Sequence, residues 1–206
     1  MKGSLIVLAA FACGCIAGWA FPGFIPAQGL SNLLLYALML QVGISIGCNG
    51  NIKQIIAQLH PRYLSLPLGT AAGTLLFSAM ASLLLSQWSV AECMAVGSGF
   101  GYYSLSSLLI TQLKTPSVGW QLAAELGTIA LLANIFREMF ALLGSPLIRK
   151  YFGPLAPISA AGATSMDVTL PVIARYSGKE MVPIAILHGI LMDFSVPFFV
   201  SFFCSL

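Results

Sequence analysis

The stretch Gly162-Ala163-Thr164-Ser165-Met166-Asp167-Val168-Thr169-Leu170-Pro171 interrupts an otherwise almost continuously apolar region. It consists of small and hydroxyl residues around one carboxylate, and it ends in a proline. A carboxylate at the centre of a membrane helix costs about 2.5–3.5 kcal/mol on insertion scales. Glycine, serine and threonine beside it offer backbone and hydroxyl groups that can hold an ion or a polar substrate. The stretch therefore predicts a binding site built from an interrupted membrane helix.

The composition places the whole chain in a membrane. Of its 206 residues, 58% are hydrophobic and 7% are charged, and the mean hydropathy is +0.93. A soluble domain carries about 25% charged residues. We therefore expect a single transmembrane domain, residues 1–206, in a lipid bilayer. The nine basic residues are scattered between apolar runs, which argues against nucleic-acid binding. The five cysteines are interpreted as free thiols rather than as a metal site.

The apolar runs predict an all-α polytopic membrane protein, because about 20 apolar residues span the hydrocarbon core. Five runs are long enough for full transmembrane helices: residues 4–21, 30–47, 64–86, 119–144 and 182–204. A short amphipathic segment is predicted at residues 52–62, and a loop is predicted at residues 145–157.

Two further segments, residues 91–113 and 156–174, are apolar but interrupted. The first contains Ser98-Gly99-Phe100-Gly101-Tyr102-Tyr103-Ser104, and the second contains the stretch quoted above. The flanks of the first break span only about 10 Å and 18 Å at 1.5 Å per residue, too little to cross alone. One full helix separates the two segments. This pattern suggests an inverted repeat with two re-entrant elements that meet near the midplane.

The basic residues favour the re-entrant arrangement. With two re-entrant segments and five spans, the residues predicted inside are Lys2, Lys53, Arg62, Arg149, Lys150, Arg175 and Lys179, and Lys114 lies outside. With seven full spans, Lys114 moves inside while Arg149 and Lys150 move outside. The positive-inside rule prefers the first arrangement by one residue. Both arrangements place the N-terminus in the cytoplasm and the C-terminus outside.

Two carboxylates are the main candidates for transport chemistry. Asp167 either neutralises itself by protonation or pairing, or it binds a cation, a proton or an ammonium group. Because desolvation favours the protonated acid and an arriving cation favours the ionised one, such a group can exchange a proton for a cation. Glu138 shares a helix face with Asn134, four residues earlier. It is either a site residue or, with Arg137, part of an ion pair at the helix end.

The remaining polar residues divide between several roles. Glu125 lies about 20 Å from Glu138 along one helix, so it is either a gate near the opposite membrane face or a solvated end. Asp193 and His188 sit in the last span, and either could line the site, although a lone histidine is more often a packing residue. Glu92 is interpreted as a helix cap. Tyr102 and its neighbour Tyr103 either contact substrate or mark an interface.

Several motifs of enzymes are missing from this sequence. It contains no phosphate loop, no paired CxxC and no HExxH. Neither Asp167 nor Asp193 stands in the pattern of an intramembrane aspartyl protease. The sequence therefore predicts no catalytic residues and no cofactor.

Three stretches resemble the LysO-type lysine exporter family. They are Gly97-Ser98-Gly99-Phe100-Gly101-Tyr102-Tyr103-Ser104-Leu105-Ser106, then Phe136-Arg137-Glu138, and then Gly162-Ala163-Thr164-Ser165-Met166-Asp167 with Thr169-Leu170-Pro171. The pieces Val42-Gly43-Ile44, Lys53-Gln54-Ile55, Met181-Val182-Pro183 and His188-Gly189 agree with it. The resemblance implies a transporter of the bacterial inner membrane that exports L-lysine and its analogues, coupled to proton entry by alternating access.

The resemblance also implies site residues and partners. The important intramembrane acids of the family correspond to Glu138, by the Arg-Glu motif, and Asp167, by the Ser-Met-Asp motif. The polar residues of the two breaks complete the predicted substrate and proton site: Ser98, Gly99, Gly101, Tyr102, Thr164 and Ser165, with Asn134, Glu125 and Asp193 beside them.

Full-length members carry a further N-terminal region of about three helices with another aspartate. We therefore expect the unit to be completed by a second copy of the chain or by a small, separately encoded membrane subunit. The alternatives are a transporter of another cationic amino acid or small organic solute, and a non-transporting subunit of a two-chain exporter.

Overall fold

A computed structural model gives the structure of the chain. It describes residues 61–206 and the single helical positions 13, 14, 16, 17, 19, 20, 33, 37, 40 and 44. Every regular element within residues 61–206 is a helix, which confirms the all-α class for this part. The predicted spans at residues 4–21 and 30–47, and most of the predicted segment at residues 52–62, lie outside the continuously described residues.

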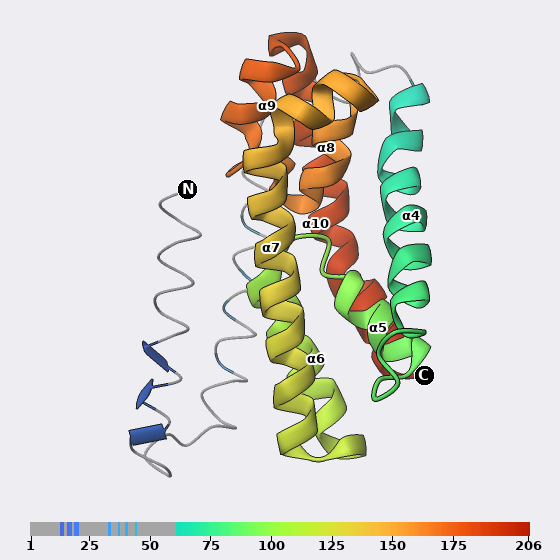
Figure 1. Cartoon of the computed structure of the whole chain (residues 1–206), viewed down its shortest axis with the longest axis vertical. Helices are drawn as coiled ribbons and strands as arrows, with labels where there is room; N and C mark the ends of the chain where they lie inside the picture. Colours follow the sequence, from blue (N-terminus) through green and yellow to red (C-terminus); the bar gives the residue numbers. More distant parts are fainter. Residues whose placement is uncertain are drawn as a thin grey trace.

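The helices follow one another along a single bundle (Figure 1). In chain order they are η1 Pro61–Leu64, α4 Ser65–Ala81, α5 Val90–Gly97, α6 Tyr103–Val118, α7 Trp120–Phe152, α8 Ala156–Ala161, η2 Gly162–Met166, α9 Leu170–Tyr176, η3 Lys179–Met181 and α10 Val182–Cys204. In the view of Figure 1, α4 and α10 run downwards along the long axis. α7, which lies between them in chain order, runs upwards.

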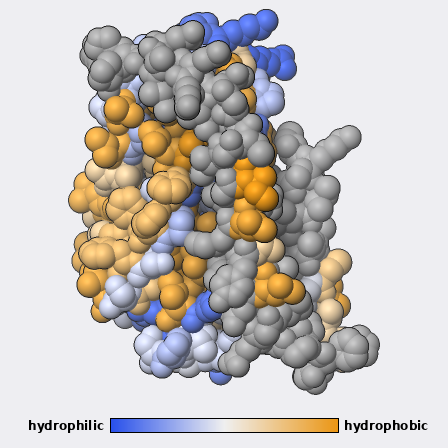
Figure 2. Space-filling view, turned by 180° about the vertical axis from the view of Figure 1, so that it is seen from behind, coloured by the Kyte–Doolittle hydropathy of each residue, from blue (hydrophilic) through white to orange (hydrophobic). Residues whose placement is uncertain are grey.

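Two of these helical segments, Trp120–Phe152 and Lys179–Cys204, are long and apolar enough to cross a membrane, and α4 is a shorter apolar helix. Hydrophobic side chains dominate the middle of the coloured surface in Figure 2, and the most hydrophilic ones gather at its upper end. A bundle with this surface fits a bilayer, whose core accepts only backbone that is paired within the protein.

The first interrupted segment is a helical hairpin formed by α5 and α6. α5 begins at a capping box in which the Ser89 hydroxyl accepts from the Glu92 backbone while the Glu92 carboxylate accepts from the Ser89 backbone, so the cap predicted at Glu92 is confirmed. The helix ends at Gly97, and the backbone turns back at Phe100 (φ 46°) and Gly101 (φ 98°). The outer ends of α5 and α6 both lie at the lower end of the bundle in Figure 1.

The second interrupted segment is a hairpin that enters from the opposite end. α8 descends from the top of Figure 1, the short η2 forms the turn near mid-height, and α9 returns upwards. Gly162 adopts φ 66° at the start of that turn. Both helix interruptions that the sequence predicts are therefore present. We name residues 98–102 the first tip and residues 162–167 the second tip.

The two tips meet inside the bundle. The backbone N–H of Ala163 donates a hydrogen bond of 2.8 Å to the carbonyl of Phe100. A Cβ on Gly162 would collide with that same carbonyl, so the contact depends on a glycine at this position.

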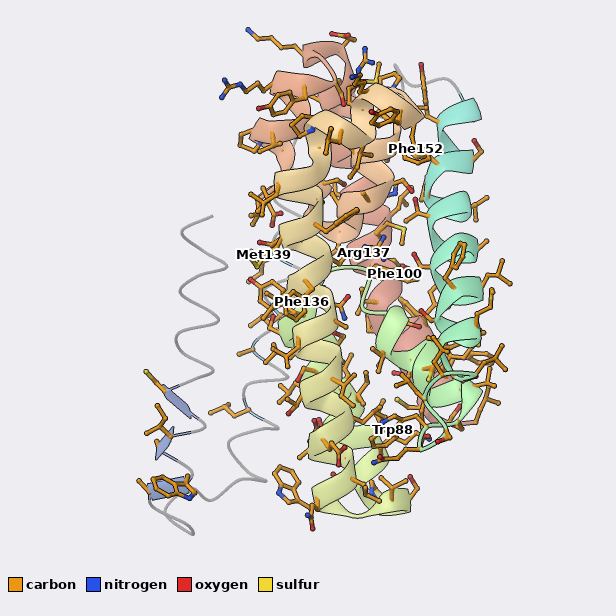
Figure 3. All side chains as sticks on the ribbon, in the orientation of Figure 1. Trp88, Phe100, Phe136, Arg137, Met139 and Phe152 are labelled. Atoms are coloured by element: carbon orange, nitrogen blue, oxygen red, sulfur yellow. The ribbon has the colours of Figure 1, made fainter. Side chains whose placement is uncertain are left out.

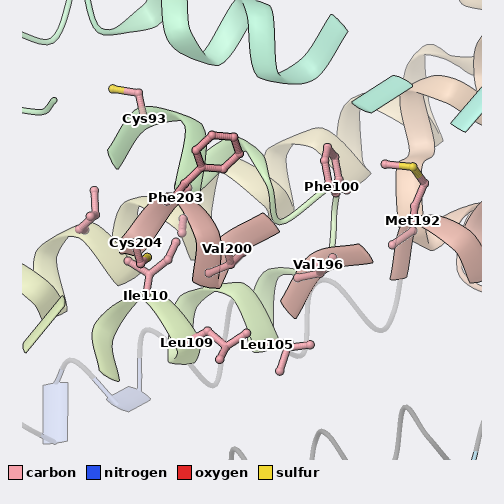
Figure 4. Close-up of a cluster of buried hydrophobic side chains, with 14 of the residues drawn as sticks. Cys93, Phe100, Leu105, Leu109, Ile110, Met192, Val196, Val200, Phe203 and Cys204 are labelled. Atoms are coloured by element: carbon pink, nitrogen blue, oxygen red, sulfur yellow. The ribbon is translucent and has the colours of Figure 1, made fainter. Parts of the chain in front are cut away.

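Two clusters of buried apolar side chains hold the hairpins against the long helices. In Figure 4, Val196, Val200 and Phe203 of α10 pack among the side chains of α5 and α6. The other cluster joins α7, α8, α9 and α10 through Ala141, Ile158, Ala161, Ile173, Ile184 and Ala185.

The predicted loop at residues 145–157 is wrong over most of its length. α7 continues through Pro146 to Phe152, and it stops at Gly153, which has φ 90°. A proline inside a helix removes one backbone hydrogen bond and normally ends the helix. Here the helix continues past Pro146, and the preceding Ser145 is buried with its hydroxyl donating to the Ala141 carbonyl. The predicted span at residues 64–86 is too long. α4 ends at Ala81, because the chain must turn to start α5.

Substituting Gly162 tests the contact between the tips. We expect Gly162→Ala to lower the thermal unfolding midpoint of the purified protein well beyond Gly153→Ala. Both alanines occupy backbone conformations that favour glycine, at a cost of about 1–3 kcal/mol each. Only the Gly162 methyl group also meets the Phe100 carbonyl, whereas nothing lies within 4 Å of a methyl group at Gly153. Equal midpoints for the two variants would show that the tips do not touch as described.

Candidate functional site

The first tip is fixed by Asn134 of α7. Its side-chain oxygen accepts a 2.7 Å hydrogen bond from the Gly101 backbone, and its amide group donates to the carbonyls of Val96 (3.3 Å) and Ala130 (2.9 Å). Asn134 is buried, so these bonds satisfy backbone groups that the break would otherwise leave unpaired in an apolar interior. A Cβ on Gly99 would collide with the Asn134 amide, which explains the glycine there.

The second hairpin is held from the same helix by Arg137. Its guanidinium donates to the carbonyls of Ala160 (3.0 Å) and Ser159 (3.1 Å), near the end of α8, and to the Thr74 hydroxyl on α4 (3.1 Å). The last carbonyls of a helix lack partners within the helix and carry partial negative charge, so a cation stabilises them.

Figure 3 shows Arg137 level with Phe100, near the middle of the bundle. The predicted position at a helix end is therefore wrong, because α7 continues about two turns beyond the predicted span and leaves Arg137 and Glu138 mid-helix.

The second tip rests on α10. The Ser165 hydroxyl donates to the Ala185 carbonyl (2.9 Å) and lies 3.2 Å from Nδ1 of His188. Gly189 lets the tip approach closely, since a Cβ there would lie 2.6 Å from the Cβ of Met166. The Thr164 hydroxyl stays within the tip and donates to the Ala161 carbonyl.

The acidic residues surround the tips. Glu138 on α7 and Asp193 on α10 are buried, with 0% and 4% of their surface exposed. Asp167 is exposed at the end of the second tip, and its carboxylate accepts a 2.5 Å hydrogen bond from the Val168 backbone. The charges of Asp167 and Asp193 lie close enough to interact with each other and with Tyr102.

The other tyrosine beside the first tip links Glu138 to this group. Tyr103 interacts electrostatically with both Glu138 and Asp167. The structure therefore brings together three of the predicted acids, both tyrosines and both tips around one place in the bundle.

Glu125 lies apart from the tips. It is exposed, and its carboxylate accepts a 3.3 Å hydrogen bond from Gln87, in the turn between α4 and α5. This agrees with the expectation that one straight helix separates Glu125 from Glu138.

A mostly apolar cavity of about 320 Å³ lies between α4, α5 and α7. It reaches Asn134 and Arg137 at the level of the tips and extends to Trp88, which Figure 3 places low in the bundle. Within the residues that the structure describes, no group of three or more His, Cys, Asp or Glu side chains is placed to hold a metal ion.

Sequence reasoning missed the residues that hold the second hairpin. Thr70 and Thr74 on α4 and Ser159 on α8 bind polar groups across helices. Single hydroxyl residues in apolar helices also bond their own backbone, as Thr128 does with Ala124. The sequence offers no signal that separates the two uses.

Comparison with known proteins agrees with these elements. Residues 8–204 match the family described as "Lysine exporter LysO". The chain belongs to this family. The family is one of transporters rather than enzymes.

Two relatives differ in length. The chain is 34% identical over 200 residues to "Lysine exporter LysO" of Escherichia coli (strain K12), covering 96% of this chain and 62% of that protein. It is 31% identical over 201 residues to the "Putative lysine exporter" of Haemophilus influenzae, covering 97% of each chain. The chain thus spans less than two thirds of the E. coli relative that it matches. No solved structure matches the chain.

Replacing Asn134 tests how the first tip is held. We expect Asn134→Leu, which keeps a similar volume, to lower the free energy of unfolding by about 1–3 kcal/mol for each buried group left unpaired. The matched control is Gln87→Leu, which removes an exposed hydrogen bond to Glu125 and should change stability little. Denaturant unfolding in detergent measures both variants. An Asn134→Leu protein as stable as the control would contradict the role assigned to Asn134.

Proposed function

We propose that the chain is a secondary transporter that exports L-lysine and its analogues from the bacterial cytoplasm in exchange for protons, by alternating access. The observation that carries the proposal is the meeting of two oppositely directed hairpin tips beside Glu138, Asp167 and Asp193. Interrupted helices that meet near the membrane midplane are the usual architecture of substrate sites in secondary transporters. The description of the family and the names of the two relatives suggest lysine as the substrate.

The acids would bind the two ammonium groups of lysine. Glu138 and Asp193 offer buried carboxylates, and Asp167 offers an exposed one that a solute can reach from outside the bundle. The N-terminal end of α6 lies at the first tip, where its free backbone N–H groups would receive the substrate carboxylate. This arrangement accounts for a substrate that carries both signs of charge.

Proton coupling would use the same carboxylates. A carboxylate that holds an ammonium group must be ionised. After lysine has left, the same carboxylate in an apolar interior is more stable when protonated. Lysine leaving outward and protons entering inward would therefore compete for the same oxygen atoms.

The orientation follows from the charged ends of the bundle. Arg149, Lys150, Arg175 and Lys179 lie on elements at the upper end of Figure 1. Lys114 is on α6, whose outer end lies at the lower end of Figure 1; it is buried and pairs with Glu92 at 3.6 Å. By the positive-inside rule the upper end would face the cytoplasm and the C-terminus would lie outside. A second copy or a small membrane subunit as partner stays a prediction.

Neutralising the acids tests their role. In proteoliposomes loaded with lysine, we expect Asp167→Asn and Glu138→Gln each to slow lysine efflux at least about tenfold, equivalent to 1.4 kcal/mol in the barrier. The matched control is Glu180→Gln, an exposed acid in η3, which should export at the wild-type rate. If the Asp167 and Glu138 variants export as fast as this control, the assignment of the substrate site is wrong.

Proton exchange has its own readout. Lysine that flows out of proteoliposomes down its gradient should carry protons in, so a dye in the lumen should report acidification. The Asp167→Asn protein serves as the control, because its efflux and its acidification should both be slower at least about tenfold. Lysine efflux with no change in luminal pH would contradict proton antiport while leaving lysine export intact.

A further inference from the structure

A chain of side-chain hydrogen bonds runs from the second tip to α4 and back to α8. The Ser165 hydroxyl lies 3.2 Å from Nδ1 of His188, and Nε2 of His188 lies 3.0 Å from the Thr70 hydroxyl. The Thr70 hydroxyl lies 2.7 Å from that of Ser159. His188 has 1% of its surface exposed and Thr70 has 5%. The consecutive elements α8 and η2 are thus linked to α4 and α10 through the His188 ring and the Thr70 hydroxyl.

The donor and acceptor in each of these hydrogen bonds follow from the bond between the Ser165 hydroxyl and the Ala185 carbonyl. The single hydroxyl proton of Ser165 is donated to the Ala185 carbonyl, so Ser165 can only accept from His188. Nδ1 of His188 therefore carries a proton. Each remaining hydroxyl has one proton to give, so a neutral ring accepts from Thr70 at Nε2, and Thr70 accepts from Ser159.

A neutral ring also fits the surroundings. None of the hydrogen bonds described for His188 involves a carboxylate, and its charge would interact with that of Arg137. A protonated His188 would place a second buried positive charge near Arg137, and burying a charge without a paired anion is costly. With the proton on Nδ1, each of the three side-chain contacts joins one donor to one acceptor, and the ring also bonds to the backbone of Gly162.

We propose that His188, as the neutral Nδ1–H tautomer, is a positioning residue that fixes the second tip, and with it Asp167, against α4. His188 touches no substrate in this role. It acts through Ser165, which lies two residues after Ala163. The backbone N–H of Ala163 bonds the same tip to Phe100 of the first hairpin. Loss of the Thr70 contact would release one side of the tip and misplace Asp167. The effect on transport rests on the proposed function, whereas the tautomer and the fixing of the tip do not.

The tautomer is tested by spectroscopy. The chain has two histidines, so a His60→Gln protein labelled with ¹⁵N-histidine reports His188 alone. We expect a protonated Nδ1 and an unprotonated, hydrogen-bonded Nε2 at pH 7. Thr70→Val, which removes the donor and keeps the shape, should shift the Nε2 signal, and Thr70→Ser should restore it. A proton on Nε2 instead, or on both nitrogens, would overturn the inference.

The positioning role is tested by kinetics. His188→Asn keeps a donor near Ser165 but cannot reach Thr70, so it removes the same contact as Thr70→Val. We expect each variant to raise the half-saturating lysine concentration about tenfold, with a similar maximum rate per folded protein, and the double variant to be no worse. Thr70→Ser should behave as wild type. Thr128→Val, which loses only a bond within α7, is the matched control. A merely structural role would lower the maximum rate and leave half-saturation unchanged, and that result would overturn the role.

A transport-independent measurement separates this inference from the proposed function. The exposed Val168, one residue beyond the second tip, is replaced by cysteine in a cysteine-free background, and its alkylation rate is measured in detergent. Thr70→Val should raise the rate several-fold, and Thr128→Val should leave it unchanged. If wild type carries no lysine, the proposed function fails and this rate still decides whether the tip is fixed. An unchanged rate with Thr70→Val would overturn the positioning role.

Discussion

The hydrogen bond between the Ala163 amide and the Phe100 carbonyl joins the two halves of the described bundle. Each partner lies at the turn of a hairpin that cannot bury its backbone alone, because a break in a membrane helix exposes N–H and C=O groups to an apolar environment. By meeting, the tips pair one backbone N–H of the second hairpin with one backbone carbonyl of the first inside the bundle. The glycine at position 162 makes the approach feasible, since any Cβ there would overlap the Phe100 carbonyl.

The remaining polar groups of the breaks are satisfied from α7. Asn134 binds the first tip on both sides of its turn, and Arg137, three residues later, binds the last carbonyls of α8. One helix therefore carries the two polar side chains that fix both hairpins, and Glu138 follows directly after them. The same constraint explains why polar residues concentrate in the middle of α7 rather than at its ends. It also places a carboxylate near the two tips, as the proposed function requires.

Much of this architecture could be predicted from residue patterns. The positions of both breaks, the last helix at residues 182–204, the cap at Glu92 and the separation of Glu125 from Glu138 follow from glycine content, apolar length and helical geometry. The extension of α7 through Pro146 could not be predicted, because local propensity opposes it and only tertiary packing supports it. The contacts of Arg137 and His188 could not be predicted either, because they join residues that are 22 to 118 positions apart and no spacing rule relates such residues. The substrate residues themselves stay predictions.

The central claim is that each interrupted segment enters and leaves on its own side, with the two segments on opposite sides. The direct measurement is the sidedness of single cysteines placed at the exposed Ser86 and Ser117, which flank the α5–α6 hairpin, and at Lys150 and Lys179, which flank the α8–α9 hairpin. An impermeant thiol reagent applied to intact cells should label the first pair and leave the second pair unlabelled until the membrane is opened. If Ser86 and Ser117 report opposite sides, the first segment crosses the membrane and the account is wrong.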